Sequence, residues 1–163
     1  MPKKKVKSLP TTAEPYKDFL LGLKFLGLGL DSSSASVDRV TLADDRSAGH
    51  AIETGFGAEY KILTQNSDRF VIGVSYSITQ KKKDATEPLV AINASFSALF
   101  ESTSALDPAH IERFSQNEAR MIFWPYLRFF VSDISARMSI SQILLPLTFE
   151  FKAGGFKDEV QQG

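Results

Sequence analysis

The chain has 163 residues and no cysteine, and its 19 basic and 19 acidic residues give a formal net charge of zero. This length fits a single domain with a core of its own. The absence of cysteine excludes disulfides, thiolate metal sites and thiol nucleophiles, and the balanced charge favours neither nucleic acid nor an anionic membrane as a partner.

The chain opens on a basic segment, MPKKKVKSLP, and residues 1–13 are predicted to form a disordered tail. The lysines also resemble a short nuclear-import motif. A polar segment follows where a secretory signal would need an apolar one, and the apolar run near residue 20 is interrupted by Lys24 and by glycines. We therefore expect a cytoplasmic protein that inserts no segment into a membrane.

The main domain is predicted over residues 14–151. EPYKDFLLGL is compatible with a turn of helix, and the glycine-spaced apolar run from Leu21 predicts a closely packed strand. Residues 41–57 are rich in Gly, Asp and Ser, and this composition predicts a long connection.

Apolar and polar residues then alternate with a period of two, which is typical of half-buried antiparallel strands. The alternating segments are residues 58–65, 69–80 and 89–100, separated by NSD at 66–68 and by the charged hairpin KKKDATEP at 81–88. With the first strand they predict a four-stranded antiparallel meander.

The period changes after residue 106. Asp107 and Pro108 form a helix start, with the carboxylate as N-cap and proline at the first helical position. The helix that follows is apolar around most of its circumference, so we expect a second subunit to cover part of it. Pro125, within FWPYLRFF, should bend this helix. The candidate oligomer-interface residues are Met121, Trp124, Pro125, Arg128, Phe129 and Ile134.

Beyond Arg137 the sequence MSISQILLPLTFEF contains Pro146 and predicts an extended crossover. Residues 152–163 are predicted to form a frayed C-terminal tail. The order of strands, long helix and crossover predicts an α+β fold.

Two motifs resemble the SecB family of protein-export chaperones. FWPYLR, from Phe123 to Arg128, is similar to the Leu-Phe-Pro-Tyr-Ala-Arg element of the family's long helix, and RMSISQILLPLTF, from Arg137 to Phe149, is similar to its proline-containing crossover. The resemblance implies a tetramer built as a dimer of dimers, with helices between the sheets. It also implies ATP-independent binding of unfolded polypeptides, without a cofactor, and delivery of clients to the SecA motor.

The chain departs from the family where the family contacts SecA through acidic residues. The hairpin after the third strand carries Lys81, Lys82 and Lys83, and the first strand offers Lys24 and glycines. These departures put SecA binding in doubt. They fit the diverged members of the family that serve as chaperones of an antitoxin.

Client binding requires apolar surface that the fold cannot bury completely. We expect it in the long connection and in the crossover, which could form a groove for extended chain. The candidate client-binding residues are Leu42, Ile52, Phe56, Ile140, Ile143, Leu145 and Phe149.

The sequence predicts neither catalysis nor a metal site. His50 lies near Asp44, Asp45, Ser47 and Glu53, but triad members usually come from distant chain segments. Two other functions remain open, a structural or regulatory oligomer without clients and a nucleic-acid-binding module that uses the lysine clusters.

Overall fold

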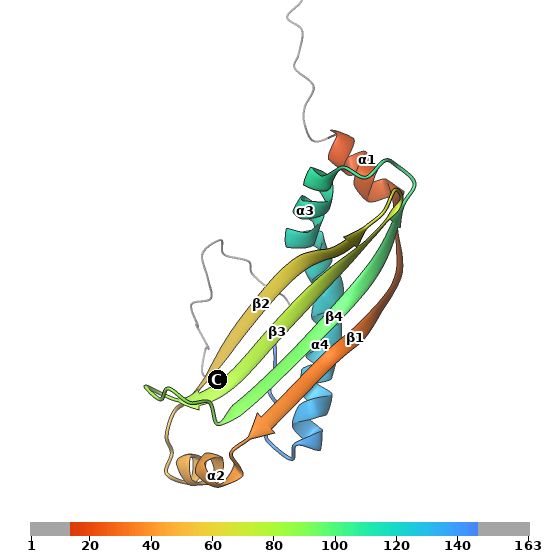
Figure 1. The fold of residues 1–163 in the computed structure, drawn as a ribbon. Helices are drawn as coiled ribbons and strands as arrows, with labels where there is room; N and C mark the ends of the chain where they lie inside the picture. The colour runs from red at the N-terminus through yellow and green to blue at the C-terminus, as the bar shows by residue number, and fades with distance from the viewer. Residues whose placement is uncertain (1–13, 147–163) are drawn as a thin grey trace, which may run out of the picture.

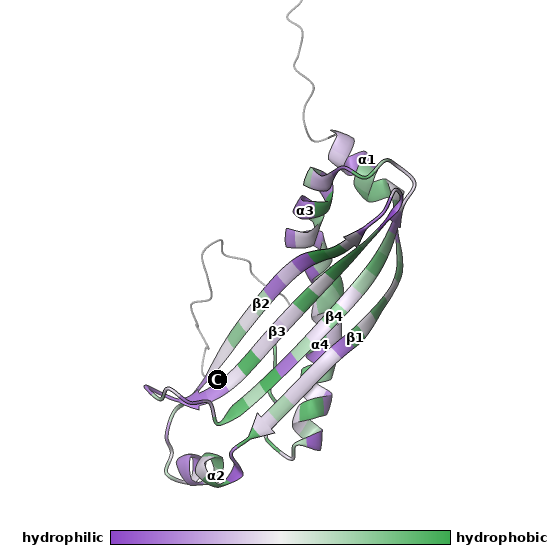
Figure 2. Cartoon of the chain, in the orientation of Figure 1, coloured by the Kyte–Doolittle hydropathy of each residue, from purple (hydrophilic) through white to green (hydrophobic). Residues whose placement is uncertain are grey.

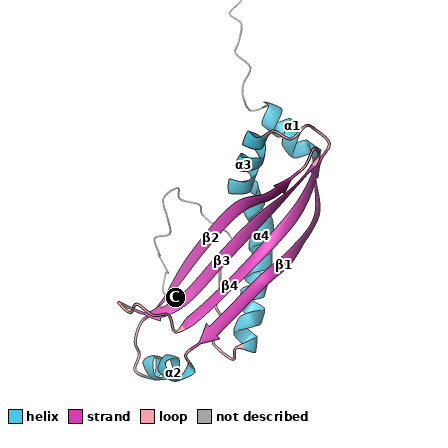
Figure 3. Cartoon of the chain, viewed as in Figure 1, coloured by secondary structure: helices cyan, strands magenta, loops and turns pink. Residues whose placement is uncertain are grey.

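The computed structural model describes residues 14–146, so the predicted tails, 1–13 and 152–163, and the end of the predicted domain lie outside it. Helices and strands combine in an α+β fold, with helices against one face and at the ends of an antiparallel sheet (Figures 1 and 3). The elements are α1 (Glu14–Gly22), β1 (Leu23–Val37), α2 (Arg39–Ser47), β2 (Ile52–Gln65), β3 (Arg69–Lys82), β4 (Val90–Ser102), α3 (Pro108–Gln116) and α4 (Glu118–Arg137). None of the described helices is long and apolar enough to cross a membrane.

The sheet has four antiparallel strands, as predicted, in the order β1-β4-β3-β2. Only β2, β3 and β4 form a meander, whereas a full meander would have placed β1 beside β2. Between β1 and β2 the chain passes α2 at the end of the sheet (Figure 1). This passage carries the chain across the width of the sheet, so β1 and β2 form opposite edges.

Helix α2 and the start of β2 correct the prediction of a connection over residues 41–57. Asp38 caps α2, because its carboxylate accepts hydrogen bonds from the backbone nitrogen and the hydroxyl of Thr41, at 3.1 and 2.7 Å. Strand β2 then begins at Ile52 and not at residue 58. The irregular part of the connection is therefore limited to residues 48–51.

Helix α2 is tied to the sheet by a small cluster of charges. The buried carboxylate of Asp45 lies 2.7 Å from Nδ1 of His50 and 3.2 Å from Nζ of Lys82 at the end of β3. The hydrogen bond with His50 lowers the pKa of Asp45, and Lys82 acts in the same direction, whereas desolvation opposes both. Among the described residues no hydrogen bond joins Ser47 to His50, so the pair of His50 and Asp45 serves here as a structural tie.

The single long helix predicted after Asp107 is two helices. The carboxylate of Asp107 accepts a hydrogen bond from the backbone nitrogen of Ala109 at 2.8 Å, which is the predicted N-cap. The helix is interrupted at Asn117, whose backbone leaves the helical region (φ −117°, ψ −82°) and whose side chain donates to the carbonyl of Arg113. Helix α4 runs through Pro125 without ending there, so the interruption lies at the asparagine.

The core lies between α4 and one face of the sheet. Hydrophobic and hydrophilic residues alternate along β3 and β4 (Figure 2), and about every second residue of these strands is buried. The central aromatic contact stacks Phe70 on Phe100, with ring centroids 5.2 Å apart, and Phe114 meets Phe100 edge-on at 5.1 Å. Phe19 of α1 joins the same aromatic group and fixes α1 over the end of the sheet.

The sheet is buried at its centre and partly open at its margins. The core-facing residues of β3 and β4 from Phe70 to Ile78 and from Val90 to Phe100 are nearly inaccessible. On β1, Phe25 and Leu30 remain 44% and 47% exposed, and on β2 the residues on the core-facing side are only partly buried. The margins of the sheet are therefore where apolar surface remains.

We predict that Phe123→Ala lowers the free energy of unfolding by about 3–5 kcal/mol, because Phe123 is fully buried between α4 and the sheet. Leu21→Ala, at a position that is 75% exposed, should cost less than about 1 kcal/mol. Urea unfolding followed by circular dichroism checks both values. Equal losses would contradict the assignment of the core.

We also predict that the stabilising effect of Asp45 depends on pH. The carboxyl has a lowered pKa in the folded state, so its contribution is present above the ordinary aspartate pKa of about 3.9 and is lost as pH falls through the folded-state value. Wild type should exceed Asp45→Asn in stability at neutral pH, and the difference should vanish in acid. Urea titrations across pH, with Asp44→Asn as control, test this. A difference that stays constant with pH would be inconsistent with the proposed tie.

Candidate functional site

Residues 138–140 form a turn at the end of α4, and residues 141–146 of the crossover then run back along the helix in extended conformation. The amide of Gln142 donates to the hydroxyl of Ser132 at 2.6 Å, and Nε of Arg128 donates to the carbonyl of Leu145 at 3.2 Å. Residues later in the crossover contact residues earlier in α4, so the two segments are antiparallel. The extended crossover is thus as predicted.

Trp124 joins the far end of the crossover to β2. Its indole Nε1 donates to the carbonyl of Pro146 at 3.0 Å, and its ring meets the ring of Phe56 edge-on at a centroid distance of 5.6 Å. Phe56 is therefore brought next to the crossover, although the two are far apart in sequence. Trp124 itself is only 8% exposed, which leaves little of its predicted interface surface for another subunit.

Helix α2 joins the near end of the crossover. Nη1 of Arg46 donates to the hydroxyl of Ser141 at 2.6 Å, and Leu42 of the same helix is buried in the core. The connection and the crossover, the two segments expected to form a groove, thus meet directly at Ser141, and at their other ends both contact Trp124 of α4.

Partly buried apolar side chains lie along these two segments, and we call Ile52, Phe56, Ile140 and Leu145 the apolar strip. Of the other predicted client-binding residues, Leu42 and Ile143 belong to the core and Phe149 lies outside the described residues. Leu144, which is 79% exposed, was not singled out from the sequence. Its neighbours on both sides are more buried, as alternation in an extended chain requires.

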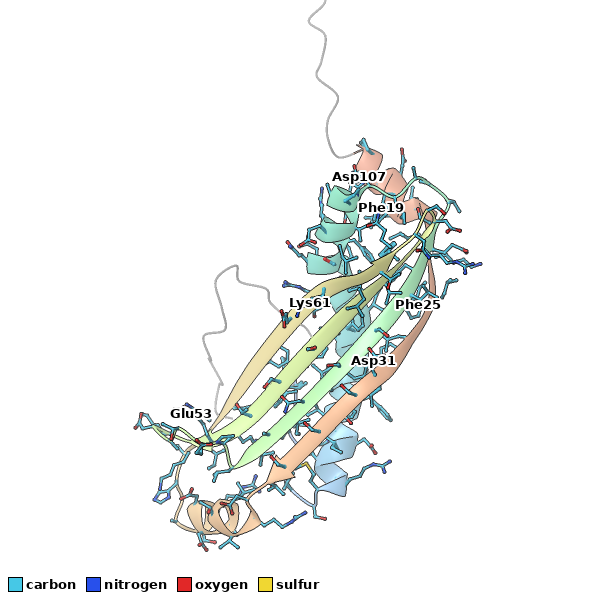
Figure 4. The ribbon with its side chains drawn as sticks, in the orientation of Figure 1. Phe19, Phe25, Asp31, Glu53, Lys61 and Asp107 are labelled. Atoms are coloured by element: carbon cyan, nitrogen blue, oxygen red, sulfur yellow. The ribbon has the colours of Figure 1, made fainter. Side chains whose placement is uncertain are left out.

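Strand β2 borders the apolar strip with an unpaired edge. Among the described strands it pairs only with β3, so alternate backbone N–H and C=O groups face outward. Glu53, Glu59 and Lys61 carry its charges, and the stretch Thr54–Ala58 has neither charge nor proline. Figure 4 shows Glu53 and Lys61 on β2, on either side of this stretch. Among the residues that the structure describes, this part of the edge therefore carries no charge or proline that would hinder an added strand.

A hollow of about 320 Å³ lies between α4 and the crossover, whose residues 142–145 line one side of it. Pro125, Arg128 and Phe129 line it from the helix, three of the predicted interface residues. Met121 and Phe129 are 74% and 77% exposed, whereas Ile134 packs partly against the core. The outer side of α4 thus carries exposed apolar surface, and the hollow beside it is shared with Leu145 of the apolar strip.

One of the three lysines of the hairpin is paired with an acidic side chain of α2. Lys82 is held by Asp45, and the exposed rings of Tyr126 and Phe129 belong to α4 and not to the hairpin. Among the described residues no three histidine, aspartate or glutamate side chains gather in a way that could hold a metal ion.

No protein-family model matches the chain. No curated protein matches it by sequence.

Among solved structures, a SecB-like chaperone of Mycobacterium tuberculosis in complex with a ChAD peptide from the HigA1 antitoxin is similar to the chain at a TM-score of 0.66. The two share 15% identity, over 79% of this chain and 93% of that one. A protein of unknown function from Streptococcus agalactiae matches with a TM-score of 0.46 and 8% identity, over 77% of this chain and 97% of that one, which is too distant to carry an argument. The chain therefore has the SecB-like fold that its helix and crossover motifs predicted.

Proposed function

We propose that the chain is an ATP-independent chaperone that holds non-native polypeptides against the apolar strip. The observation that carries this proposal is the apolar strip itself, partly exposed beside the unpaired edge of β2. The similarity in fold between this chain and a SecB-like chaperone supports the same function.

Two kinds of contact would act together in this site. Ile52, Phe56 and Leu145 offer apolar surface to client side chains, which gives most of the binding free energy. The outward N–H and C=O groups of β2 pair with an extended client backbone, whose chemistry is the same in every sequence. Such a site accepts many sequences provided that they are unfolded and carry apolar residues. Capture and release then follow from binding equilibria alone.

We propose a dedicated antitoxin as the client in preference to a secretory precursor passed to SecA. The face of the sheet away from α4 carries mainly small and hydroxyl side chains, such as Ser75 and Ser95, which bond to each other at 3.0 Å. The SecB family uses acidic residues to meet SecA, and here the hairpin offers Lys81 and Lys83. The mycobacterial SecB-like chaperone of similar fold was solved in complex with an antitoxin peptide, and this supports an antitoxin as the client of the present chain.

We further propose that the chain acts in the cytoplasm as a homo-oligomer, a tetramer built as a dimer of dimers. Exposed Met121 and Phe129 on α4, with Pro125 between them, form apolar surface of the kind that a second copy covers. A partner on this side would cover the hollow that Leu145 lines, whereas Ile52 and Phe56 on β2 do not line that hollow and would stay accessible to clients.

We predict that the purified chain suppresses aggregation of an unfolded protein at stoichiometric amounts without ATP. Ala58→Lys should weaken binding of reduced, carboxymethylated α-lactalbumin by about tenfold or more, because it places an ammonium group among apolar contacts. Ala58 is exposed and pairs with Tyr76, so it lies on the core-facing side of β2.

The matched control is Glu59→Lys, the next residue of the same strand, which faces the opposite side of the sheet. It also introduces a lysine and should leave the dissociation constant unchanged within about twofold. Fluorescence anisotropy gives the constants. If wild type binds neither this client nor an antitoxin encoded beside it, the chaperone proposal is wrong.

For the oligomer, we predict that Met121→Lys combined with Phe129→Lys lowers the mass measured by light scattering to that of a smaller assembly. Charges on both residues would have to be desolvated at an apolar interface. Gln116→Lys, at an exposed position on α3, serves as the control. A wild-type protein that is monomeric at micromolar concentration would contradict the prediction.

A further inference from the structure

The described chain ends beside the open edge of β2. Its last described residue is Pro146, whose carbonyl accepts a hydrogen bond from the indole nitrogen of Trp124 at 3.0 Å. The ring of Trp124 meets that of Phe56 on β2 at a centroid distance of 5.6 Å. Two or three residues of extended chain span roughly 7–10 Å, which is enough to pass a single indole ring. The residues that follow Pro146 can therefore reach the edge of β2.

The crossover approaches this point in the same direction as β2. Along α4, the guanidinium of Arg120 lies 5.0 Å from the ring centroid of Tyr60, and Trp124 meets Phe56. Residues later in α4 thus contact residues earlier in β2, so the helix and the strand are antiparallel. The crossover is antiparallel to α4 in turn. A segment that continues its course therefore passes along Ala58–Ile62.

This part of the edge has an apolar side and a charged side. Ala58, Tyr60 and Ile62 pair with core residues of β3, and Tyr60 and Ile62 are only partly buried. Glu59 and Lys61 lie on the opposite side, where their charged groups are well exposed and 2.9 Å apart. An exposed ion pair of this kind contributes little free energy, so Lys61 is available to a second carboxylate. Among the described strands only β3 pairs with β2, so the edge has room for a further strand.

The sequence LTFEFK, at 147–152, follows directly and matches this edge. Apolar and polar residues alternate in it with a period of two, over a length that is usual for a strand. With the apolar residues on the core-facing side, Phe149 and Phe151 lie beside the partly buried side chains of β2. Glu150 then lies on the opposite side, which is the side of Lys61. Both sides of the edge are thus complemented.

We propose that residues 147–152 add to the edge of β2 as a fifth strand, parallel to β2 along Ala58–Ile62. The two phenylalanines of this segment cover the partly buried apolar side chains there, and Glu150 pairs with Lys61. A client must then displace the segment before it can pair with the whole edge, a consequence that rests on the proposed chaperone function. The chain thus competes with its clients for its own site.

The first experiment uses the absence of cysteine from the chain. In the full chain with Lys61→Cys and Glu150→Cys, mild oxidation should join the two cysteines, because adjacent residues of neighbouring strands are about 5 Å apart, within the range of a disulfide. Glu53→Cys with Glu150→Cys is the matched control. Glu53 lies on the same side of β2 as Lys61 but eight residues earlier, about 26 Å away along the strand. Figure 4 shows both residues on β2.

Mass spectrometry after alkylation measures the yield of each disulfide. The first pair should exceed the control pair about tenfold or more, because docking of the segment raises the effective concentration of the two thiols. Equal yields in both pairs would overturn the inference. Disulfides that join two chains, seen as a dimer on a denaturing gel, would also overturn it.

The second experiment measures client binding by the full chain with Phe149→Ser and Phe151→Ser. The dissociation constant for reduced, carboxymethylated α-lactalbumin should fall about three- to tenfold, because the segment no longer occupies the edge. Phe156→Ser, the same change beyond the segment, should leave the constant unchanged. If Phe149 lines the client site instead, the constant rises. A rise or an unchanged constant in the double variant would contradict the inference.

The two experiments separate this inference from the proposed function. If the wild type binds clients and the first experiment fails, residues 147–152 do not dock on β2, although the chaperone function stands. If the wild type binds no client, the proposed function fails, whereas the disulfide between positions 61 and 150 still decides whether the segment docks on β2.

Discussion

The width of one helix is the constraint on which the rest of the structure depends. An α-helix with its side chains is about 10–12 Å across, whereas four strands at about 4.8 Å spacing span roughly 15–19 Å. Helix α4 can therefore cover the two central strands but not both margins. The burial follows this geometry, since Phe70 and Phe100 on β3 and β4 are inaccessible while Phe25 on β1 is exposed and Phe56 on β2 is only partly covered.

On the β2 side, the crossover supplies a partial cover in place of a second helix. It forms no ladder, and side chains such as Trp124, Arg128 and Arg46 hold it by single hydrogen bonds. Two of these bonds end on backbone carbonyls, so they fix the path of the crossover whatever its side chains are. A segment held in this way opens more readily than a paired strand. This is the property that a site for extended chain at the edge of β2 would need.

How much the sequence predicted depends on how local the signal is. The alternation of β3 and β4 and the Asp107 cap are encoded within a few residues, and both were found. Helix α2 was missed because it has few apolar residues. The cap at Asp38 with Thr41 was the one signal that could have revealed it. The pairing of β1 with β4 and the meeting of Phe56 with Trp124 join residues far apart in the chain, so no local pattern contains them.

The same geometry explains why two chains with only 15% identity, this one and the mycobacterial SecB-like chaperone, can share a fold. In the central strands, apolar and polar residues have to alternate with a period of two, and the helix has to be apolar on several sides. Both requirements concern residue types in a pattern, and many sequences satisfy that pattern. The margins are different, because their side chains are only partly covered by the core. Under the proposed function, residues such as Ile52 and Leu145 contact the client and can change with it while the fold stays the same. For this reason the identity of the client has to be determined from the margins, and similarity in fold does not transfer it.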